Sequence, residues 1–408
     1  MNKKELVQTA KQPVTSRNDP EPSCPSTAPT PPDSSSPRPR PSISPDLSRK
    51  LTAVSFLAAY GVVFIHSYPS TITIEMEPTI DICLCDVIEK FASTFAVPMF
   101  FTISGFLFAV KTDLGRQPRW YPVTLKKKVG SLLVPFLIWC TIYAVSYIPF
   151  KLYGNYRAGR DLVFALPMLK LPLLSVRNIF GIYGFFIPKY PGCPILWFIR
   201  NLMLLFLVSP LLLFLFKKRF VAILFLIVVF IAIVFENKMP FWHSNRGFSF
   251  GGLFYFSLGI FFAFSPLSRC SFSVIRRMLP PLWIASVFLQ TVYYRLDMLG
   301  TSYQFLADLS ALLGVGSVWL LPDYIRPLLR IGSWKVAKDT FFLYVFHYLV
   351  LAFVFFNTME RFLLYKLHIP LLIIFFLRVI GSSVPSLIIA ELMKKHLPAL
   401  YRILTGGR

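Results

Sequence analysis

Long apolar runs, separated by short polar stretches, dominate the chain from about residue 50 onward. An α-helix rises about 1.5 Å per residue, so roughly 20 apolar residues cross the ~30 Å hydrocarbon layer of a membrane. Backbone polar groups in lipid must be paired within their own segment, which favours a helix for each run. The pattern predicts an all-α, polytopic membrane helix bundle of about ten transmembrane helices, at residues 51–68, 88–110, 128–149, 195–216, 219–236, 249–266, 279–297, 303–321, 340–358 and 369–393.

Composition separates two classes of basic protein. The 408 residues are 55% hydrophobic and only 15% charged, with 42 Lys and Arg against 19 Asp and Glu. A basic excess is typical of nucleic-acid-binding proteins and of membrane proteins, and the distribution of the charges decides between them. Here the cations cluster between apolar runs, which is the membrane pattern. We therefore expect membrane lipids, and no nucleic acid, as partners.

Alternate loops carry most of the basic residues, which predicts an orientation. One set contains KKK at 126–128 and KKR at 217–219, whereas the opposite set contains the acidic stretch IEMEPTIDICLCD at 74–86. Because basic loops stay in the cytoplasm, both termini are predicted to be cytoplasmic, in a multi-pass protein of the cell inner membrane.

Three regions follow from the change in composition along the chain. Residues 1–47 are rich in Pro and Ser and lack apolar periodicity, which predicts a disordered cytoplasmic arm. Residues 48–400 form the membrane domain, and residues 401–408 form a cytoplasmic tail. The arm has no apolar segment ahead of a small-residue cleavage site, so it is not a secretory signal peptide.

The six cysteines show no metal-ligand spacing, and no metal is predicted. Cys83 or Cys85 could form a disulfide with Cys193 if their loops share an oxidising side of the membrane.

Four ionisable side chains fall inside the predicted spans, where they usually face a bundle interior or a wet cavity. They are His66, Arg200, His347 and Arg378. His66, Arg200 and Arg378 lie toward the outer side, and His347 lies nearer the middle. Each also has a structural interpretation, since a buried histidine can be a packing residue and an arginine near a span end can extend to the interface. The common depth of several of them favours a functional site.

The chemistry of these side chains suits acyl transfer from a thioester to a hydroxyl. A histidine can take and return a proton near neutral pH. A guanidinium cannot act as a base, but it can stabilise a developing oxyanion. No cysteine lies beside His66 in the sequence, and Ser67 faces elsewhere on a helix, so no nucleophile pair is indicated. Tyr344 and His347 are three residues apart and share one helix face.

Six stretches occur in the order and spacing of the acyltransferase 3 family: FLAAYGVVFIHS, VPMFFTISGFLFA, KKKVGSLLVPFLIW, PILWFIRNLMLLF, FYFSLGIFFA and DTFFLYVFHYLV. The chain resembles this family over residues 48–400. Its members are multispanning enzymes that acylate extracytoplasmic sugars and lipids, including surface-polysaccharide O-acetyltransferases. The resemblance implies an O-acyltransferase that moves an acetyl or short acyl group to a hydroxyl of a cell-envelope glycan or glycolipid.

The resemblance also implies roles for residues. It makes His66 the catalytic base, with Arg200 beside it, and it places Ser104, Trp197, Tyr344 and His347 in the substrate site, to which we add Arg378. The chain departs from the family at one position, since many members carry Arg or Lys eleven positions before the histidine and this chain has Ser55. A second basic position of the family, before Pro135, is Ser131 here.

The donor implied by the resemblance is acyl-CoA, with acetyl-CoA favoured, and its phosphates suit the cations Lys126, Lys127, Lys128 and Arg119. The same lysines can equally be ordinary orienting charge. The alternative function is an exporter or flippase of a glycan precursor, in which the polar residues would line a pathway. An internal repeat would favour transport, and the motifs show none.

Overall fold

The computed structural model describes residues 43–69, 79–112, 120–157, 165–166, 169–170, 181–184, 193–236, 249–264, 273–352 and 359–407. All of them belong to one compact unit that begins at Ile43. Of the predicted N-terminal arm, residues 1–42 lie outside the described part.

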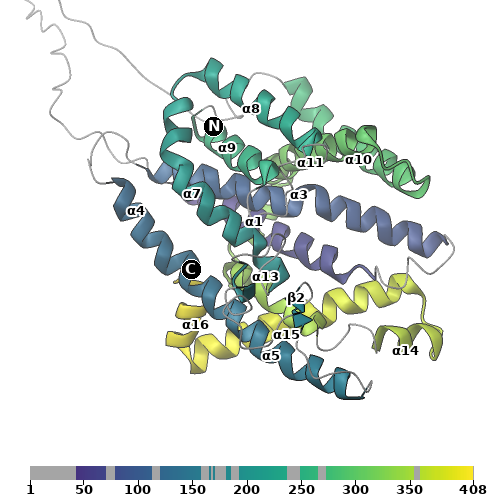
Figure 1. The fold of residues 1–408 in the computed structure, drawn as a ribbon. Helices are drawn as coiled ribbons and strands as arrows, with labels where there is room; N and C mark the ends of the chain where they lie inside the picture. Colours follow the sequence, from purple (N-terminus) through teal and green to yellow (C-terminus); the bar gives the residue numbers. More distant parts are fainter. Residues whose placement is uncertain are drawn as a thin grey trace, which may run out of the picture. The chain divides into compact units, whose positions relative to one another are not determined.

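The described chain is almost entirely helical (Figure 1). Its α-helices are α1 (Pro45–Ser67), α3 (Ile80–Lys111), α4 (Trp120–Lys128), α5 (Val134–Arg157), α7 (Trp197–Leu215), α8 (Arg219–Val234), α9 (Phe250–Phe264), α10 (Ser273–Arg295), α11 (Thr301–Tyr324), α12 (Leu328–Ile331), α13 (Thr340–Val350), α14 (Met359–Tyr365), α15 (Leu371–His396) and α16 (Pro398–Thr405).

Short elements complete the fold. A π-helical turn, Val129–Leu133, joins α4 to α5, and the 3-10 turns Pro194–Leu196 and Val336–Asp339 precede α7 and α13. The two strands β1 (Ala165–Leu166) and β2 (Leu169–Lys170) pair antiparallel, with Leu166 opposite Leu169.

Six helical stretches of the described chain are long and apolar enough to cross a membrane: Pro45–Ser67, Ile80–Lys111, Trp120–Ser146, Pro194–Leu215, Thr301–Tyr324 and Leu371–His396. The apolar helices α8 and α9 are shorter. A helix occupies each of the ten predicted ranges where these are described. The helical membrane class is therefore confirmed, whereas the number of ten crossings stays a prediction.

Local capping explains where the first two long helices begin. The Ser44 hydroxyl accepts from the Leu47 N–H at 3.2 Å, and Pro45 occupies the first turn of α1, both of which favour a helix start. Thr79 caps α3 in the same way, with its hydroxyl 3.4 Å from the Ile82 nitrogen. The stretch after Thr79 was expected to be an outer loop, and that expectation is wrong because this cap starts the helix at Ile80.

Helix α3 is the central element, in contact with α1, α9, α10 and α11. Its closest approach is to α9, where glycines replace side chains at the crossing. A Cβ atom added at Gly105 would lie 1.9 Å from the Phe256 carbonyl oxygen, and one added at Gly259 would lie 2.0 Å from the Thr102 carbonyl oxygen. Small residues are common at helix contacts in membranes because they let two backbones approach closely.

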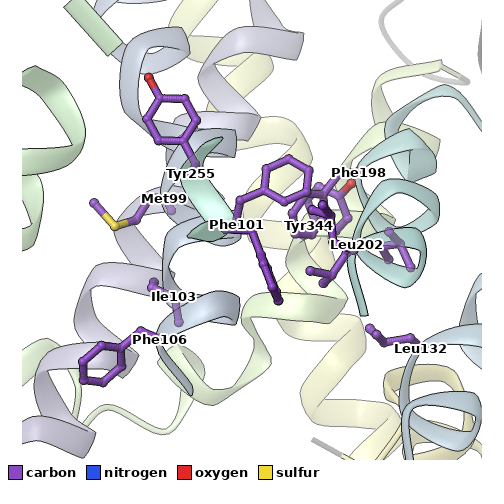
Figure 2. Packing of buried hydrophobic residues seen from close by; sticks show 14 of the residues in the cluster. Met99, Phe101, Ile103, Phe106, Leu132, Phe198, Leu202, Tyr255 and Tyr344 are labelled. Atoms are coloured by element: carbon purple, nitrogen blue, oxygen red, sulfur yellow. The ribbon is translucent and has the colours of Figure 1, made fainter. Parts of the chain in front are cut away.

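Aromatic side chains fill the interface of α3 with α7 and α13. The Phe101 and Phe198 rings meet edge to face with centroids 4.6 Å apart, and Figure 2 shows Phe198 lying close to Tyr344. Edge-to-face pairs of this kind stabilise a core beyond the area that they bury.

The C-terminal helix α16 is held against the bundle by buried polar contacts. The Asp339 carboxylate accepts from the Tyr401 hydroxyl at 2.5 Å and from the Lys394 ammonium at 2.8 Å. The Trp139 indole N–H donates to the Leu404 carbonyl oxygen at 2.9 Å. Burial and the nearby Asp339 carboxylate raise the pKa of Tyr401, so its hydroxyl remains a donor. The predicted tail therefore includes residues packed on the membrane domain.

Gly105→Ala should destabilise the protein by about 1–3 kcal/mol or more, because the new methyl group must displace the backbone of α9. Thermal unfolding of the purified protein in detergent measures the change. Gly130→Ala is the matched control, since no atom lies within 4 Å of its added Cβ. Equal melting temperatures for the two variants would contradict the close α3–α9 crossing.

Candidate active site

Two histidines meet at the C-terminal end of α1. The His66 ring centroid lies 5.7 Å from that of His347 and 5.1 Å from that of Tyr348, which it meets edge to face. His66 is the last but one residue of α1, whereas His347 and Tyr348 come from α13. The contacts between α1 and α13 thus bring together two of the ionisable residues that the sequence singled out.

The hydrogen bonding of His347 fixes its tautomer. The ring is fully buried, and its Nδ1 lies 3.0 Å from the Leu343 carbonyl oxygen. A carbonyl oxygen only accepts, so Nδ1 carries the proton of the neutral ring and Nε2 holds a lone pair. Nε2 is buried and has no hydrogen-bond partner among the described residues. A proton acceptor therefore lies beside His66.

A buried ion pair contacts the backbone at His66. The side chains of Arg378 and Glu360 are each 1% exposed, with 2.5 Å between Nη1 and the carboxylate. Arg378 Nη2 also lies 3.4 Å from the His66 carbonyl oxygen, a long hydrogen bond. This links α14 and α15 to the end of α1.

A second buried carboxylate holds the residue that follows α1. Asp86 of α3 is 2% exposed, and it accepts hydrogen bonds from the Tyr68 hydroxyl and the Arg295 guanidinium. Tyr68 caps the C-terminus of α1, two residues after His66. The end of α1 is therefore fixed by ion pairs from two sides, and the position of His66 depends on both.

A cavity of about 680 Å³ lies between α1, α3, α7 and α13. At one end, its wall includes the three cations Lys111, Lys128 and Lys338. These come from the end of α3, the end of α4 and the turn before α13. The rest of the wall is mainly apolar, with hydroxyl groups from Thr52 and Ser55 among others. We call this space the lysine-lined cavity.

Several predicted site residues lie on its wall. Ser104, Tyr344 and Lys128 line the cavity, as does Ser55, which replaces the basic residue common in the family. The Lys128 ammonium also lies 4.1 Å from the centroid of the Phe206 ring. Ser131, the other departure from the family, lines the same cavity.

The other predicted donor-binding cations have different positions. Lys126 and Lys127 are exposed on α4 and are not part of the cavity wall. Arg119 lies outside the described residues. Of the predicted basic cluster, Lys128 is therefore the member that the structure brings to the cavity.

Arg200 and Trp197 lie at the start of α7. Arg200 is buried, and its Nη1 donates to the Gly184 carbonyl oxygen at 3.1 Å. Trp197 is half-buried, with its ring 6.3 Å from that of Phe101. The Arg378 guanidinium contacts the His66 backbone. The predicted pairing of His66 with Arg200 stays a prediction.

The expected disulfide is absent, since Cys83, Cys85 and Cys193 are all free thiols. Cys83 and Cys85 belong to α3, whereas Cys193, in front of the turn before α7, lies against Cys140 of α5, whose thiol contacts the Cys193 backbone.

Sequence reasoning missed the partners of the buried charges. Glu360 and Asp86 lie outside the predicted spans, and nothing in their spacing points to Arg378 or Arg295. Tyr348 follows His347 directly. Its contact with His66 could not be predicted, because it depends on how α13 packs against α1. The nearest signal was charge balance, because an arginine buried in a membrane bundle often pairs with a carboxylate.

The fold and the site define a helical membrane protein in which the half-buried His66 meets the buried His347, about one helical turn beyond Tyr344 of a cation-lined cavity. A family model described as an acyltransferase domain (Acyl_transf_3) matches residues 51–390, which is most of the chain. The chain therefore belongs to the acyltransferase 3 family, and the resemblance found in its motifs is confirmed. No curated protein and no solved structure gave a match.

Glu360→Ala should cost about 3–5 kcal/mol of stability, because it leaves a buried guanidinium without its counter-charge. The double variant Glu360→Ala, Arg378→Leu should recover most of the loss, since it removes both charges. Unfolding in detergent is measured for Glu360→Ala, for Arg378→Leu and for the double variant. The three values give the coupling energy between Glu360 and Arg378.

Glu391→Ala is the matched control, because Glu391 is half exposed in its pair with Lys394 and an exposed ion pair contributes only about 0–1 kcal/mol. Additive losses in the Glu360 and Arg378 variants would show that the two side chains do not depend on each other.

Proposed function

We propose that the protein transfers an acetyl or short acyl group from acyl-CoA to a hydroxyl of a cell-envelope glycan or glycolipid. The observation that carries this proposal is the arrangement along α13. Tyr344 lines the lysine-lined cavity, and His347 follows it after three residues and meets His66. Three residues rise about 4.5 Å along a helix, so a donor in the cavity would end close to the two histidines.

The orientation proposed for the chain has ten membrane spans, both termini in the cytoplasm and the inner membrane as its location. The lysines of the cavity, Lys111, Lys128 and Lys338, all lie in or beside the basic loops. By the positive-inside rule, the cavity then opens to the cytoplasm, where acyl-CoA is made, and His66 faces the outer side. Donor and acceptor would thus approach from opposite sides.

The cavity suits a CoA thioester by size and charge. Lysine ammonium groups bind phosphate as point charges, and Lys111, Lys128 and Lys338 are at its polar end. Its apolar wall would accept the pantetheine arm. Lys126, Lys127 and Arg119 remain proposed contacts for the nucleotide outside the cavity. The substitution of Ser55 for a basic residue implies that lysines from other elements take over its charge.

In the proposed reaction, His66 takes the proton of the acceptor hydroxyl as its oxygen attacks the thioester carbonyl carbon. The tetrahedral intermediate then expels the CoA thiolate, which accepts the proton from His66. The Nε2 lone pair of His347 can hold the neighbouring imidazolium through a hydrogen bond. We assign oxyanion stabilisation to Arg200 and a positioning role to Arg378, whose guanidinium is paired with Glu360.

The direct test supplies radiolabelled acetyl-CoA to proteoliposomes that contain the purified protein and extracted envelope glycans. The proposal expects label in the glycan fraction, in an ester linkage that mild alkali cleaves to free acetate. Movement of glycan across the membrane without incorporation of label would favour the alternative, an exporter or flippase.

His66→Ala should lower turnover at least ~100-fold, the usual scale for loss of a general base. His396→Ala is the matched control, because His396 is exposed at the end of α15. The measurement is label incorporation at equal amounts of inserted protein. Turnover like that of the wild type in the His66 variant would remove this residue from the catalytic role.

Lys128→Gln and Lys338→Gln should each raise the KM for acetyl-CoA roughly tenfold with little change in kcat, since a charged hydrogen bond contributes about 1.5–3 kcal/mol. Lys395→Gln removes an exposed charge elsewhere and serves as the control. An unchanged KM in both cavity variants would show that the donor phosphates bind outside the lysine-lined cavity.

A further inference from the structure

The segment at the end of α16 forms part of the wall of the lysine-lined cavity. Gly406 and Gly407 follow α16 directly, and both line the cavity. A Cβ atom added at Gly406 would lie 2.4 Å from the Ser131 carbonyl oxygen, so the two backbones are in contact. Ser131 comes three residues after Lys128, in the π-helical turn that joins α4 to α5. The end of α16 therefore lies beside the lysine end of the cavity.

The same helix is also fixed beside a second lysine of the cavity. The Tyr401 hydroxyl of α16 donates to the Asp339 carboxylate at 2.5 Å, and Asp339 follows Lys338 directly in the turn before α13. The Trp139 indole N–H of α5 donates to the Leu404 carbonyl oxygen at 2.9 Å. All four of these partners are buried, so α16 has a defined position against α5 and the turn before α13.

The last carbonyl groups of α16 are paired, which matters for an anionic ligand. A helix C-terminus carries partial negative charge, because its last carbonyl groups have no partners within the helix. The carbonyl oxygens of Tyr401, Arg402, Ile403 and Leu404 accept hydrogen bonds from the Thr405 hydroxyl, the Gly407 N–H, the Gly406 N–H and the Trp139 indole, at 2.8, 2.8, 3.3 and 2.9 Å respectively. This pairing reduces the repulsion that a phosphate group would meet at the end of a helix.

Gly407 is the residue of this segment with open space around it. Its φ is +74°, and a Cβ atom added to it would meet no described atom within 4 Å. The residue is exposed and also lines the cavity, so a side chain here would lie where the cavity reaches the protein surface. Asn and Asp adopt a positive φ more readily than other residues with a side chain, so both can replace Gly407 with little strain.

We propose that the end of α16, residues 404–407, is part of the donor site and lies next to the phosphate groups of bound CoA. This inference rests on the acyl-CoA donor proposed above. Lysine ammonium groups bind phosphate as point charges, and the segment is packed on the turns beside Lys128 and Lys338. A negative charge introduced at Gly407 should therefore repel the phosphates and oppose the attraction of these lysines.

Binding of CoA to the full-length protein in detergent, measured by calorimetry, tests the proposal. In low salt, Gly407→Asp should raise the Kd for CoA roughly tenfold relative to Gly407→Asn, which adds an uncharged side chain of the same shape. In about 1 M salt, where charges are screened beyond roughly 3 Å, the difference should fall to about twofold or less. Dephospho-CoA, which lacks one phosphate group, should show a smaller difference than CoA. Equal melting temperatures show that both variants are folded.

Gly300→Asp is the matched control for the added charge. Gly300 is exposed, and a Cβ atom added to it would meet no described atom within 4 Å. It precedes α11, whose other end pairs with α1 through Asp323 and Lys50 at 2.6 Å, next to the cavity residue Leu51. The length of α11, about 35 Å at helical rise, separates Gly300 from that pair. Gly300→Asp should leave the Kd for CoA unchanged.

The outcomes separate this inference from the proposed function. If the wild type binds CoA and the two Gly407 variants have the same Kd in low salt, the segment does not lie next to the phosphates. The inference is then overturned, although acyl-CoA remains the donor. If the wild type binds neither CoA nor dephospho-CoA, the proposed donor is wrong, and the inference fails together with it.

Discussion

The ion pair between Arg378 and Glu360 is the contact on which the site depends most. A guanidinium inside an apolar bundle needs a counter-charge or backbone carbonyl partners, and removing one partner of a buried ion pair costs far more than the pair contributes. This pair also reaches the His66 carbonyl oxygen, while Asp86 holds Tyr68 just beyond it. Two buried carboxylates thus fix the end of α1. These contacts hold the last turn of α1, whose carbonyl groups have no partners within the helix, and so keep the His66 imidazole in place.

The kind of side chain that lines the cavity changes from one end of the cavity to the other. Cations lie at one end of the lysine-lined cavity, apolar side chains form much of the rest of its wall, and Tyr344 of that wall stands about one helical turn before His347, which meets His66. For the proposed reaction, this order matches the donor itself, from phosphates through the pantetheine arm to the acyl group. The close crossing of α3 and α9 at Gly105 and Gly259 keeps α3, which supplies much of the wall, at the centre of the bundle.

Much of the fold could be predicted because hydropathy reports directly on burial in lipid. The helices lie where the apolar runs do. His66, His347 and Arg378 could be identified as candidate site residues because an ionisable side chain inside such a run has a high free-energy cost. The start of α3 was missed because IEMEPTIDICLCD has the composition of a loop, and its cap depends on one threonine. Glu360 and Asp86 could not be found, since an ion pair depends on which helices meet.

The sidedness of the reaction tests the central claim most directly. Proteoliposomes of known orientation would carry labelled acetyl-CoA on one side only, with the glycan acceptor on the other. The account predicts incorporation when the donor faces the side of Lys111, Lys128 and Lys338 and the acceptor faces the end of α1, and at most a trace in the reverse arrangement. Equal incorporation from both arrangements, in vesicles shown to be sealed, would contradict a donor cavity and a histidine site that open to opposite sides.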